Sequence, residues 1–129
     1  MNDAELEAHY RRYLDCLNGR RIDELDEFVH EDLVYNGEPE TRADYRGRIA
    51  ESIAAIPDLH YEARLIVVGG DRVACRLVFE CTPQSEWLGL QPTGASISFS
   101  EHIFYKFRDG KNYEAWSLLD VPAIEAQLA

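Results

Sequence analysis

Apolar residues in the first half of the chain recur with the period of a helix. Near the N-terminus they fall on one stripe of a helix, at Leu6, Tyr10, Tyr13, Leu14 and Leu17. Asn2 or Asp3 can cap the start of this helix, and Gly19 can end it. A second, shorter helix is predicted next, and its inward-facing residues are Ile22, Leu25, Phe28 and Val29.

A third helix is predicted after a short extended segment at residues 33–35 and a turn at Asn36-Gly37. It starts at Thr41, and Asp44 three residues later completes a capping box. Pro57 ends it, because proline cannot continue a helix. The apolar stripe of this helix consists of Tyr45, Ile49, Ile53 and Ile56.

The second half of the chain shows the alternation of strands. Four segments alternate, at residues 59–68, 73–81, 97–107 and 112–119. Gly69-Gly70-Asp71 and Asp109-Gly110-Lys111 predict hairpin turns, and Pro122 begins a short helix that ends near Leu128. Helices followed by antiparallel strands predict one α+β domain over residues 1–129, with the helices packed on one face of a curved sheet.

One carboxylate interrupts the apolar face of the strand from Ile97 to Phe107. The odd positions of this strand are apolar or aromatic except for Glu101. A glutamate is almost never fully buried unless it is paired, hydrogen-bonded or protonated. Glu101 is therefore either a core carboxylate with a structural partner or a group that lines a cavity and has a chemical task.

A sheet that curls around helices can leave a pocket between them. Glu101 and Ser117 are expected on the same inner face, since the turn at residues 109–111 pairs their strands. We assign them as catalytic candidates, although simple packing also accounts for Ser117 and for the nearby tyrosines. An apolar pocket with few polar groups is the usual form of a small-molecule site. The expected ligand-binding residues are Tyr35, Trp87, Phe99, Ile103, Tyr105, Tyr113 and Ala115.

The opposite face of the predicted sheet carries two aromatic residues, Phe104 and Trp116. Two aromatic residues are more than a solvent-exposed face usually carries. This face is therefore expected to pack against a second copy of the chain and form a homodimer.

The composition narrows the classes of partner. A chain of 129 residues with 46% hydrophobic residues suits one globular domain, and a net charge of −11 argues against nucleic acid or an anionic membrane as partner. No segment approaches the ~20 apolar residues that cross a membrane, and residues 1–7 lack the apolar run of a signal peptide.

Three cysteines without a CxxC motif indicate free thiols and a cytoplasmic location. Neither His60 nor His102 has a second ligand at metal spacing, so no metal site is expected.

Three stretches of the chain, in order, share the pattern of a known family. They are Asn18-Gly19-Arg20 with Asp23 to Phe28 and His30-Glu31-Asp32; Leu88-Gly89-Leu90-Gln91-Pro92-Thr93-Gly94; and Asp109-Gly110-Lys111 with Glu114, Trp116, Asp120 and Gln127-Leu128. In these stretches the chain resembles the SnoaL-like polyketide cyclase family of the nuclear-transport-factor-2-like superfamily. The resemblance implies a cone-shaped curved antiparallel sheet wrapped around N-terminal helices, and dimers or higher oligomers formed through the sheet.

The resemblance also implies a chemistry, which this chain follows only in part. Enzymes of the family close a ring by an intramolecular aldol condensation, need no cofactor, and use an acidic residue on the last strand as acid/base. The position of that acid corresponds to Ser117, and two histidine positions correspond to Ala115 and Ile103. Glu101 corresponds to a polar residue that helps hold the substrate, and it is the only carboxylate left on the predicted pocket face of these strands.

Three functions are compatible with this pattern. The first is a cofactor-free enzyme in which Glu101 removes a proton next to the carbonyl of a small hydrophobic compound, while Ser117 or a tyrosine hydroxyl stabilises the enolate. A cyclisation, an isomerisation or a hydration-type step would follow. The second is a binding module for an apolar ligand that uses the same pocket without chemistry, and the changed Ser117, Ala115 and Ile103 positions favour it. The third is an interaction role through the outer face of the sheet.

Overall fold

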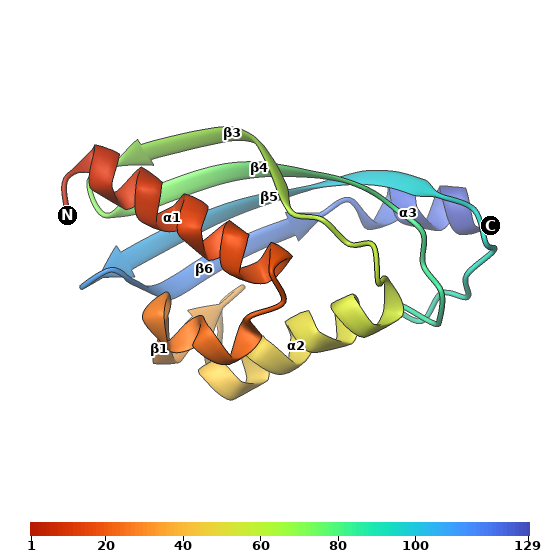
Figure 1. The fold of residues 1–129 in the computed structure, drawn as a ribbon, viewed down its shortest axis with the longest axis horizontal. Coiled ribbons are helices and arrows are strands. Elements are labelled where there is room, and N and C mark those ends of the chain that lie inside the picture. Colours follow the sequence, from red (N-terminus) through yellow and green to blue (C-terminus); the bar gives the residue numbers. More distant parts are fainter.

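The computed structural model covers residues 1–129 and consists of one sheet with helices (Figure 1). The elements in chain order are α1 (Asp3–Asn18), the short 3-10 helix η1 (Ile22–Glu27), β1 (Val29–Tyr35), β2 (Glu38–Thr41), α2 (Arg42–Ala55), β3 (Glu62–Gly69), β4 (Arg72–Cys81), β5 (Ile97–Arg108), β6 (Lys111–Leu119) and α3 (Val121–Leu128).

The six strands form one curved sheet in the order β2-β1-β6-β5-β4-β3. Neighbouring strands are antiparallel except β1 and β6, which run parallel. Helices α1 and α2 lie on the same side of this sheet (Figure 1), and α3 packs beside β5, where Gln127 hydrogen-bonds to the main chain of Ser98. The predicted α+β fold with helices on one face of a curved sheet is therefore confirmed, with one parallel pair added.

The two long helices begin where the sequence predicts. The Asn2 side-chain oxygen accepts a hydrogen bond from the Glu5 main-chain N–H, and the Glu5 carboxylate accepts one from the Asn2 main-chain N–H. Asn2 is therefore the N-cap of α1. Thr41 and Asp44 form the same reciprocal capping box at the start of α2. Both helices turn their apolar stripes toward the sheet, where the core of 27 buried residues lies.

The segment between α1 and α2 differs from the prediction. The predicted second helix is a 3-10 helix that ends at Glu27, and Val29 belongs to β1. Only Leu25 is buried in η1, and so short a helix has little stability of its own. Strand β2 was not predicted from the sequence, and it is polar and contains Pro39. It is an edge strand, where a missing N–H is tolerated.

A bulge in the last hairpin corrects the predicted inner face of β6. Ser117 pairs with Ile103 and Ala115 with Tyr105, but the register shifts next to Phe107, which pairs with Asn112. Asn112 is consequently buried, and Tyr113 turns away from the cavity and lies under the Arg108 guanidinium, 4.2 Å from its ring centre. Counting every second residue fails at this point because a bulge adds one residue to one strand.

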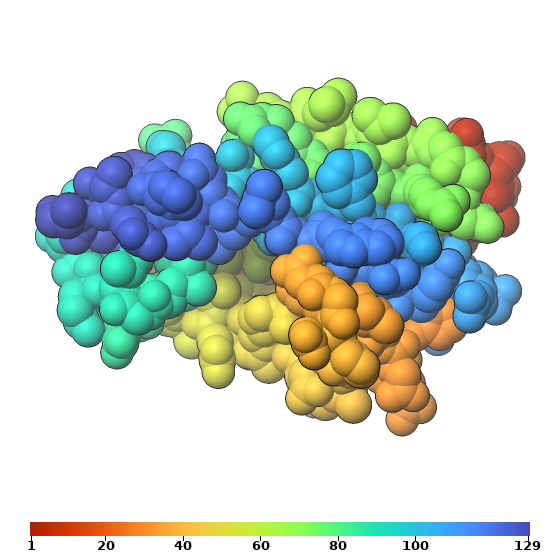
Figure 2. All heavy atoms as spheres, turned by 180° about the vertical axis from the view of Figure 1, so that it is seen from behind, coloured from red at the N-terminus to blue at the C-terminus, as the bar shows by residue number.

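The face of the sheet opposite α1 and α2 is not covered by a helix, and it carries an apolar row among polar residues. In Figure 2 strands β3 to β6 lie at the surface, with α3 beside one end. One row of the sheet register joins four apolar residues across these strands, Val67, Ala74, Phe104 and Trp116. Phe104 is 58% exposed and Trp116 39%. The expected outer position of both aromatic residues is thus confirmed.

None of the helices combines the length and the apolar character that crossing a membrane requires. Cys16, Cys75 and Cys81 are buried free thiols. The cytoplasmic location stays a prediction.

Replacing Thr41 by Ala should lower the free energy of unfolding by about 1 kcal/mol, because an end of α2 loses its cap. Urea unfolding followed by circular dichroism measures the change. The matched control is Thr41→Ser, which keeps the hydroxyl and should stay close to the wild type. Equal stability of all three proteins would contradict a stabilising cap at this position.

Candidate functional site

A cavity of about 240 Å³ lies between the inner face of the sheet and helices α1 and α2. Sixteen of its 21 lining residues are hydrophobic. Helix α1 contributes Tyr13, Leu14 and Leu17, and α2 contributes Tyr45, Arg48, Ile49 and Ser52. The apolar stripes that make these helices amphipathic therefore also form the wall of the cavity.

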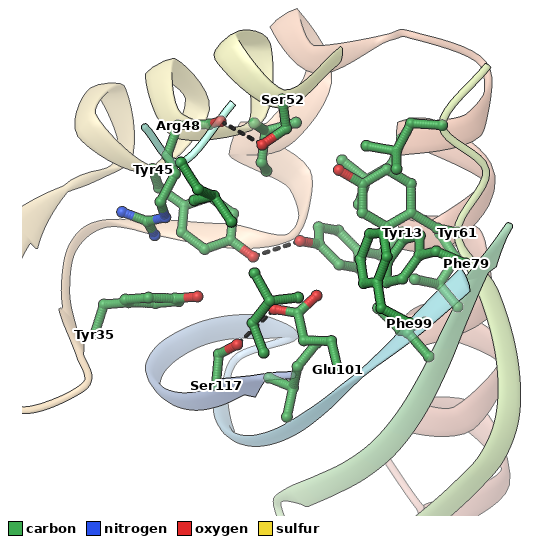
Figure 3. Close-up of a pocket in the computed structure, with 18 of the residues that line it drawn as sticks. Tyr13, Tyr35, Tyr45, Arg48, Ser52, Tyr61, Phe79, Phe99, Glu101 and Ser117 are labelled. Atoms are coloured by element: carbon green, nitrogen blue, oxygen red, sulfur yellow. Dashed lines mark hydrogen bonds between the residues drawn. The ribbon is translucent and has the colours of Figure 1, made fainter. Parts of the chain in front are cut away.

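Glu101 is the only carboxylate in this wall, and Ser117 holds it (Figure 3). The Ser117 hydroxyl donates to one carboxylate oxygen of Glu101, with 2.5 Å between Oγ and Oε2. Burial raises the pKa of the Glu101 carboxyl above its ordinary value, while the bond from Ser117 and the charge of Arg48 partly oppose that rise. The second oxygen, Oε1, forms no hydrogen bond with the protein, so it is free to meet a ligand.

Asn36, in the turn that follows strand β1, fixes the position of Ser117. The Ser117 main-chain N–H donates to the Asn36 side-chain oxygen (2.8 Å), and the Asn36 N–H donates to the Ala115 carbonyl (2.9 Å). Asn36 has a φ of 50°, a left-handed conformation that asparagine tolerates well. The sequence identified Asn36-Gly37 only as a turn, because nothing in a local pattern shows that β1 lies beside β6.

Tyrosine hydroxyls surround the carboxylate. Tyr13 and Tyr45 hydrogen-bond to each other across the cavity, and Tyr35 points toward the Glu101–Ser117 pair (Figure 3). The Tyr61 hydroxyl forms no hydrogen bond with the protein. Burial raises the pKa of Tyr35 and of Tyr61, so both phenols stay protonated near neutral pH and can donate to a ligand oxygen.

Arg48 is the only basic residue in the cavity wall, and its charge is already paired. Its two terminal nitrogens donate to the two carboxylate oxygens of Glu40, each at 2.9 Å. Its guanidinium also covers the Tyr35 ring, 3.9 Å from the centre. Since guanidinium groups stack on aromatic faces, this clamp fixes the ring of Tyr35 beside the mouth of the cavity.

Trp87 and Leu88 close part of the mouth. The Trp87 indole N–H donates to the Ser52 hydroxyl on α2 (3.2 Å), and the main chains of Trp87 and Leu90 pair around a two-residue turn. Leu88 lines the cavity although it is 49% exposed, and its φ of 54° is uncommon for a bulky residue. This tight turn thus presents an apolar side chain at the opening.

The structure brings most of the predicted site residues together. Those that line the cavity are Glu101, Ser117, Tyr35, Trp87, Phe99, Ile103 and Tyr105. Tyr113 does not line it, because of the bulge described above. Ala115 does not either: it pairs with both Tyr35 and Tyr105 in the sheet and is fully buried. The functional roles of all these residues remain predictions.

Several lining residues were not predicted as site residues. Tyr13 and Tyr45 were recognised as the apolar stripes of helices, which is the only signal that the sequence gives for them. No sequence pattern indicated that Arg48 or Tyr61 would line the cavity. The chain has no group of three or more His, Cys, Asp or Glu side chains placed to hold a metal ion.

Comparison with known proteins gives a consistent picture. The family model described as SnoaL-like polyketide cyclase matches residues 7–128. A search of curated proteins finds no match. Among solved structures, a SnoaL-like polyketide cyclase from Agrobacterium tumefaciens shares 42% identity with a TM-score of 0.89, covering 96% of this chain and 98% of the other.

Two solved structures from Streptomyces are also similar. AclR from Streptomyces galilaeus, a candidate hydroxylase, is 26% identical with a TM-score of 0.85 over 98% of this chain and 97% of its own. IdmH from Streptomyces antibioticus, a candidate polyketide cyclase, is 26% identical with a TM-score of 0.83 over 99% of each chain. Similar folds thus occur in proteins described with different reactions.

Replacing Glu101 by Gln should stabilise the protein at neutral pH relative to the wild type, because the buried site disfavours the charged carboxylate. The pKa of Glu101 is raised on folding, so the stability that the protonated carboxyl provides is present below its unfolded pKa of about 4.3 and is lost as pH rises through the folded pKa. The gap between variant and wild type should therefore be small at pH 4 and widen to a plateau above the folded pKa.

Urea unfolding at a series of pH values measures this gap. Glu125→Gln, at an exposed carboxylate of α3, is the matched control, and its gap to the wild type should not widen with pH. A gap for Glu101→Gln that shrinks as pH rises would show that the site favours the charged form.

Proposed function

The chain belongs to the SnoaL-like polyketide cyclase family, and we propose that it catalyses a cofactor-free cyclisation or isomerisation of a small hydrophobic carbonyl compound in its cavity. The observation that carries this proposal is a single carboxylate of raised pKa in an apolar cavity, oriented by a serine and with one oxygen free. A carboxylate tuned upward by burial is a better base near neutral pH than one in water.

Glu101 acts as the base. Its free oxygen, Oε1, takes a proton from the carbon next to the substrate carbonyl, while Oε2 keeps the bond from the Ser117 hydroxyl. The electron pair of the broken C–H bond forms a C=C bond, and the carbonyl electrons move to oxygen to give an enolate. In an isomerisation the proton of Glu101 then returns to a different carbon; in a cyclisation the enolate carbon attacks a second carbonyl and the new alkoxide takes the proton.

The enolate needs a hydrogen-bond donor, and the geometry favours Tyr35 over Ser117 for this role. The Ser117 hydroxyl is already committed to Glu101, which makes Ser117 a positioning residue. The Tyr35 hydroxyl points toward the same carboxylate (Figure 3), and the Arg48 guanidinium fixes its ring. A donor held in place before the reaction stabilises a developing oxyanion without reorganisation.

A second candidate function is a binding module without chemistry. One observation favours it, namely that Ser117 occupies the position at which the family resemblance implies the catalytic acid. The cavity and its apolar wall serve this function equally well. The two candidates differ in one measurable property, which is whether the protein moves a proton on a bound ketone.

Exchange of carbon-bound hydrogen tests the proposal without knowledge of the natural substrate. We expect the wild-type protein to accelerate the exchange of the α-hydrogens of 2-tetralone in D₂O, followed by proton NMR. Glu101→Gln should reduce this acceleration by at least about 100-fold, the typical contribution of a general base. Full acceleration by Glu101→Gln would exclude Glu101 as the base, and saturable binding without exchange would favour the binding module.

Ser117→Ala supplies a control with a distinct signature. Since the bond from Ser117 lowers the pKa of Glu101, its loss should move the rising limb of the pH–rate profile to higher pH. A variant with a reduced rate but an unmoved profile would show that Ser117 contributes only to packing.

The outer face of the sheet is proposed to bind a second copy of this chain. The apolar row Val67, Ala74, Phe104 and Trp116 crosses four strands, and the adjoining row consists of Leu65, Arg76, His102 and Leu118, of which Leu65 and Leu118 are exposed. Two copies of this face can bury their apolar rows against each other in an isologous dimer.

Light scattering coupled to size exclusion tests this assembly. The wild-type chain should elute as a dimer and Phe104→Ser as a monomer at micromolar concentration. Leu88→Ser, which removes an apolar residue that is 49% exposed and lines the cavity instead, should remain dimeric. A monomeric wild-type chain would refute the assembly.

A further inference from the structure

From the dimensions, aromatic wall and charge of the cavity, and on the basis of the proposed function, we infer that the substrate is an uncharged planar ketone of at most two fused rings. Three independent observations support this substrate class.

The first observation is size. The cavity of about 240 Å³ is below the 300–1,000 Å³ of sites for drug-sized ligands. Hydrogen bonds limit its expansion, because Tyr13 and Tyr45 join α1 to α2 and Trp87 is tied to Ser52. A site of this size favours one or two fused rings with a short side chain over a larger ring system, part of which would lie outside the cavity wall.

The second observation is the shape and chemistry of the wall. Phe79 and Phe99 are stacked, with ring centres 4.9 Å apart and planes at 20°, and Trp87 lies 5.4 Å from Phe99. Tyr61 meets the edge of this group from the other side, 5.5 Å from Phe79. All four rings line the cavity. Because these rings lie at several angles to one another, they offer both faces and edges, which favour a planar ring by offset stacking or edge-to-face contact.

The third observation is charge. The only basic group of the wall, Arg48, already has both terminal nitrogens bonded to Glu40, so no free cation is present to meet a substrate carboxylate or phosphate. Glu101 itself repels an anion, and an unpaired buried anion is costly. A cationic ligand would lose its hydration in this largely apolar wall and could pair only with Glu101, a carboxyl whose neutral form burial favours. The protonated phenols of Tyr35 and Tyr61 line the same cavity and can donate to a carbonyl oxygen.

Isothermal titration calorimetry with matched probes tests the inference. Acetophenone, 2-acetylnaphthalene and 2-acetylanthracene vary the number of rings at constant polar group. 2-Naphthoate and 2-naphthamidine keep the two rings and nearly the same outline but carry a negative or a positive charge. We expect 2-acetylnaphthalene to bind at least about tenfold more tightly than 2-acetylanthracene and than either charged probe.

Three variants locate the binding and test its cause. Ile49→Trp adds a larger side chain to the cavity wall and should lower the affinity for 2-acetylnaphthalene at least about tenfold. Phe104→Ser, on the outer face of the sheet, should leave this affinity unchanged. Glu40→Gln frees the guanidinium of Arg48 and should increase the affinity for 2-naphthoate without changing that for 2-acetylnaphthalene.

The inference is overturned if 2-acetylanthracene, 2-naphthoate or 2-naphthamidine binds as tightly as 2-acetylnaphthalene, if Ile49→Trp has no effect, or if 2-acetylnaphthalene does not bind. Its failure is distinct from failure of the proposed function. Preferential binding of the neutral two-ring ketone without α-hydrogen exchange would retain the ligand class and reject the catalysis. Exchange of α-hydrogens together with tighter binding of larger or charged probes would retain the catalysis and reject the ligand class.

Discussion

The burial of one carboxyl group in an apolar cavity is the constraint on which the rest of the site depends. Moving Glu101 from water into the cavity is unfavourable for its charged form, which is why burial is the largest influence on its pKa. The surrounding structure offsets this cost only in part, by a hydrogen bond from Ser117 and by the field of Arg48. The carboxyl group is therefore held in place by one oxygen, while the other oxygen has no hydrogen bond to the protein, unlike that of a fully satisfied core carboxylate.

The cavity stays open because its walls are joined by directed contacts as well as by packing. Leucine and isoleucine side chains alone could fill the space between α1, α2 and the sheet. Instead tyrosine hydroxyls meet in pairs, Tyr13 with Tyr45 and Tyr10 with Tyr105, and these bonds set the distance between the elements. Three of these four rings, Tyr13, Tyr45 and Tyr105, also line the cavity. Aromatic residues therefore contribute both to the packing of the fold and to the wall of the cavity.

The family relationship explains the scaffold better than the chemistry. The family model spans residues 7–128, and a protein 42% identical over almost its whole length has the same fold. Yet Ser117 occupies the position at which the family resemblance implies the catalytic acid. The carboxylate of this chain lies on the adjacent strand, at Glu101. In the structure these two side chains are hydrogen-bonded, so a carboxylate still reaches the same part of the cavity from the neighbouring strand. Function resides in such placements rather than in the fold.

The sequence by itself determined the elements with a strong local period and the anomaly among them. The stripes of α1 and α2, the strands from Val73 to Cys81 and Ile97 to Phe107, and the unusual position of Glu101 all follow from spacing within one segment. The tertiary structure decided what depends on contacts between distant segments. The β1–β6 pairing brings Asn36 to Ser117, a bulge removes Tyr113 from the cavity, and α2 carries Arg48 over Tyr35. The physical reason is that periodicity tells which face a side chain occupies, whereas register, bulges and the packing of helices on a sheet decide what it meets there.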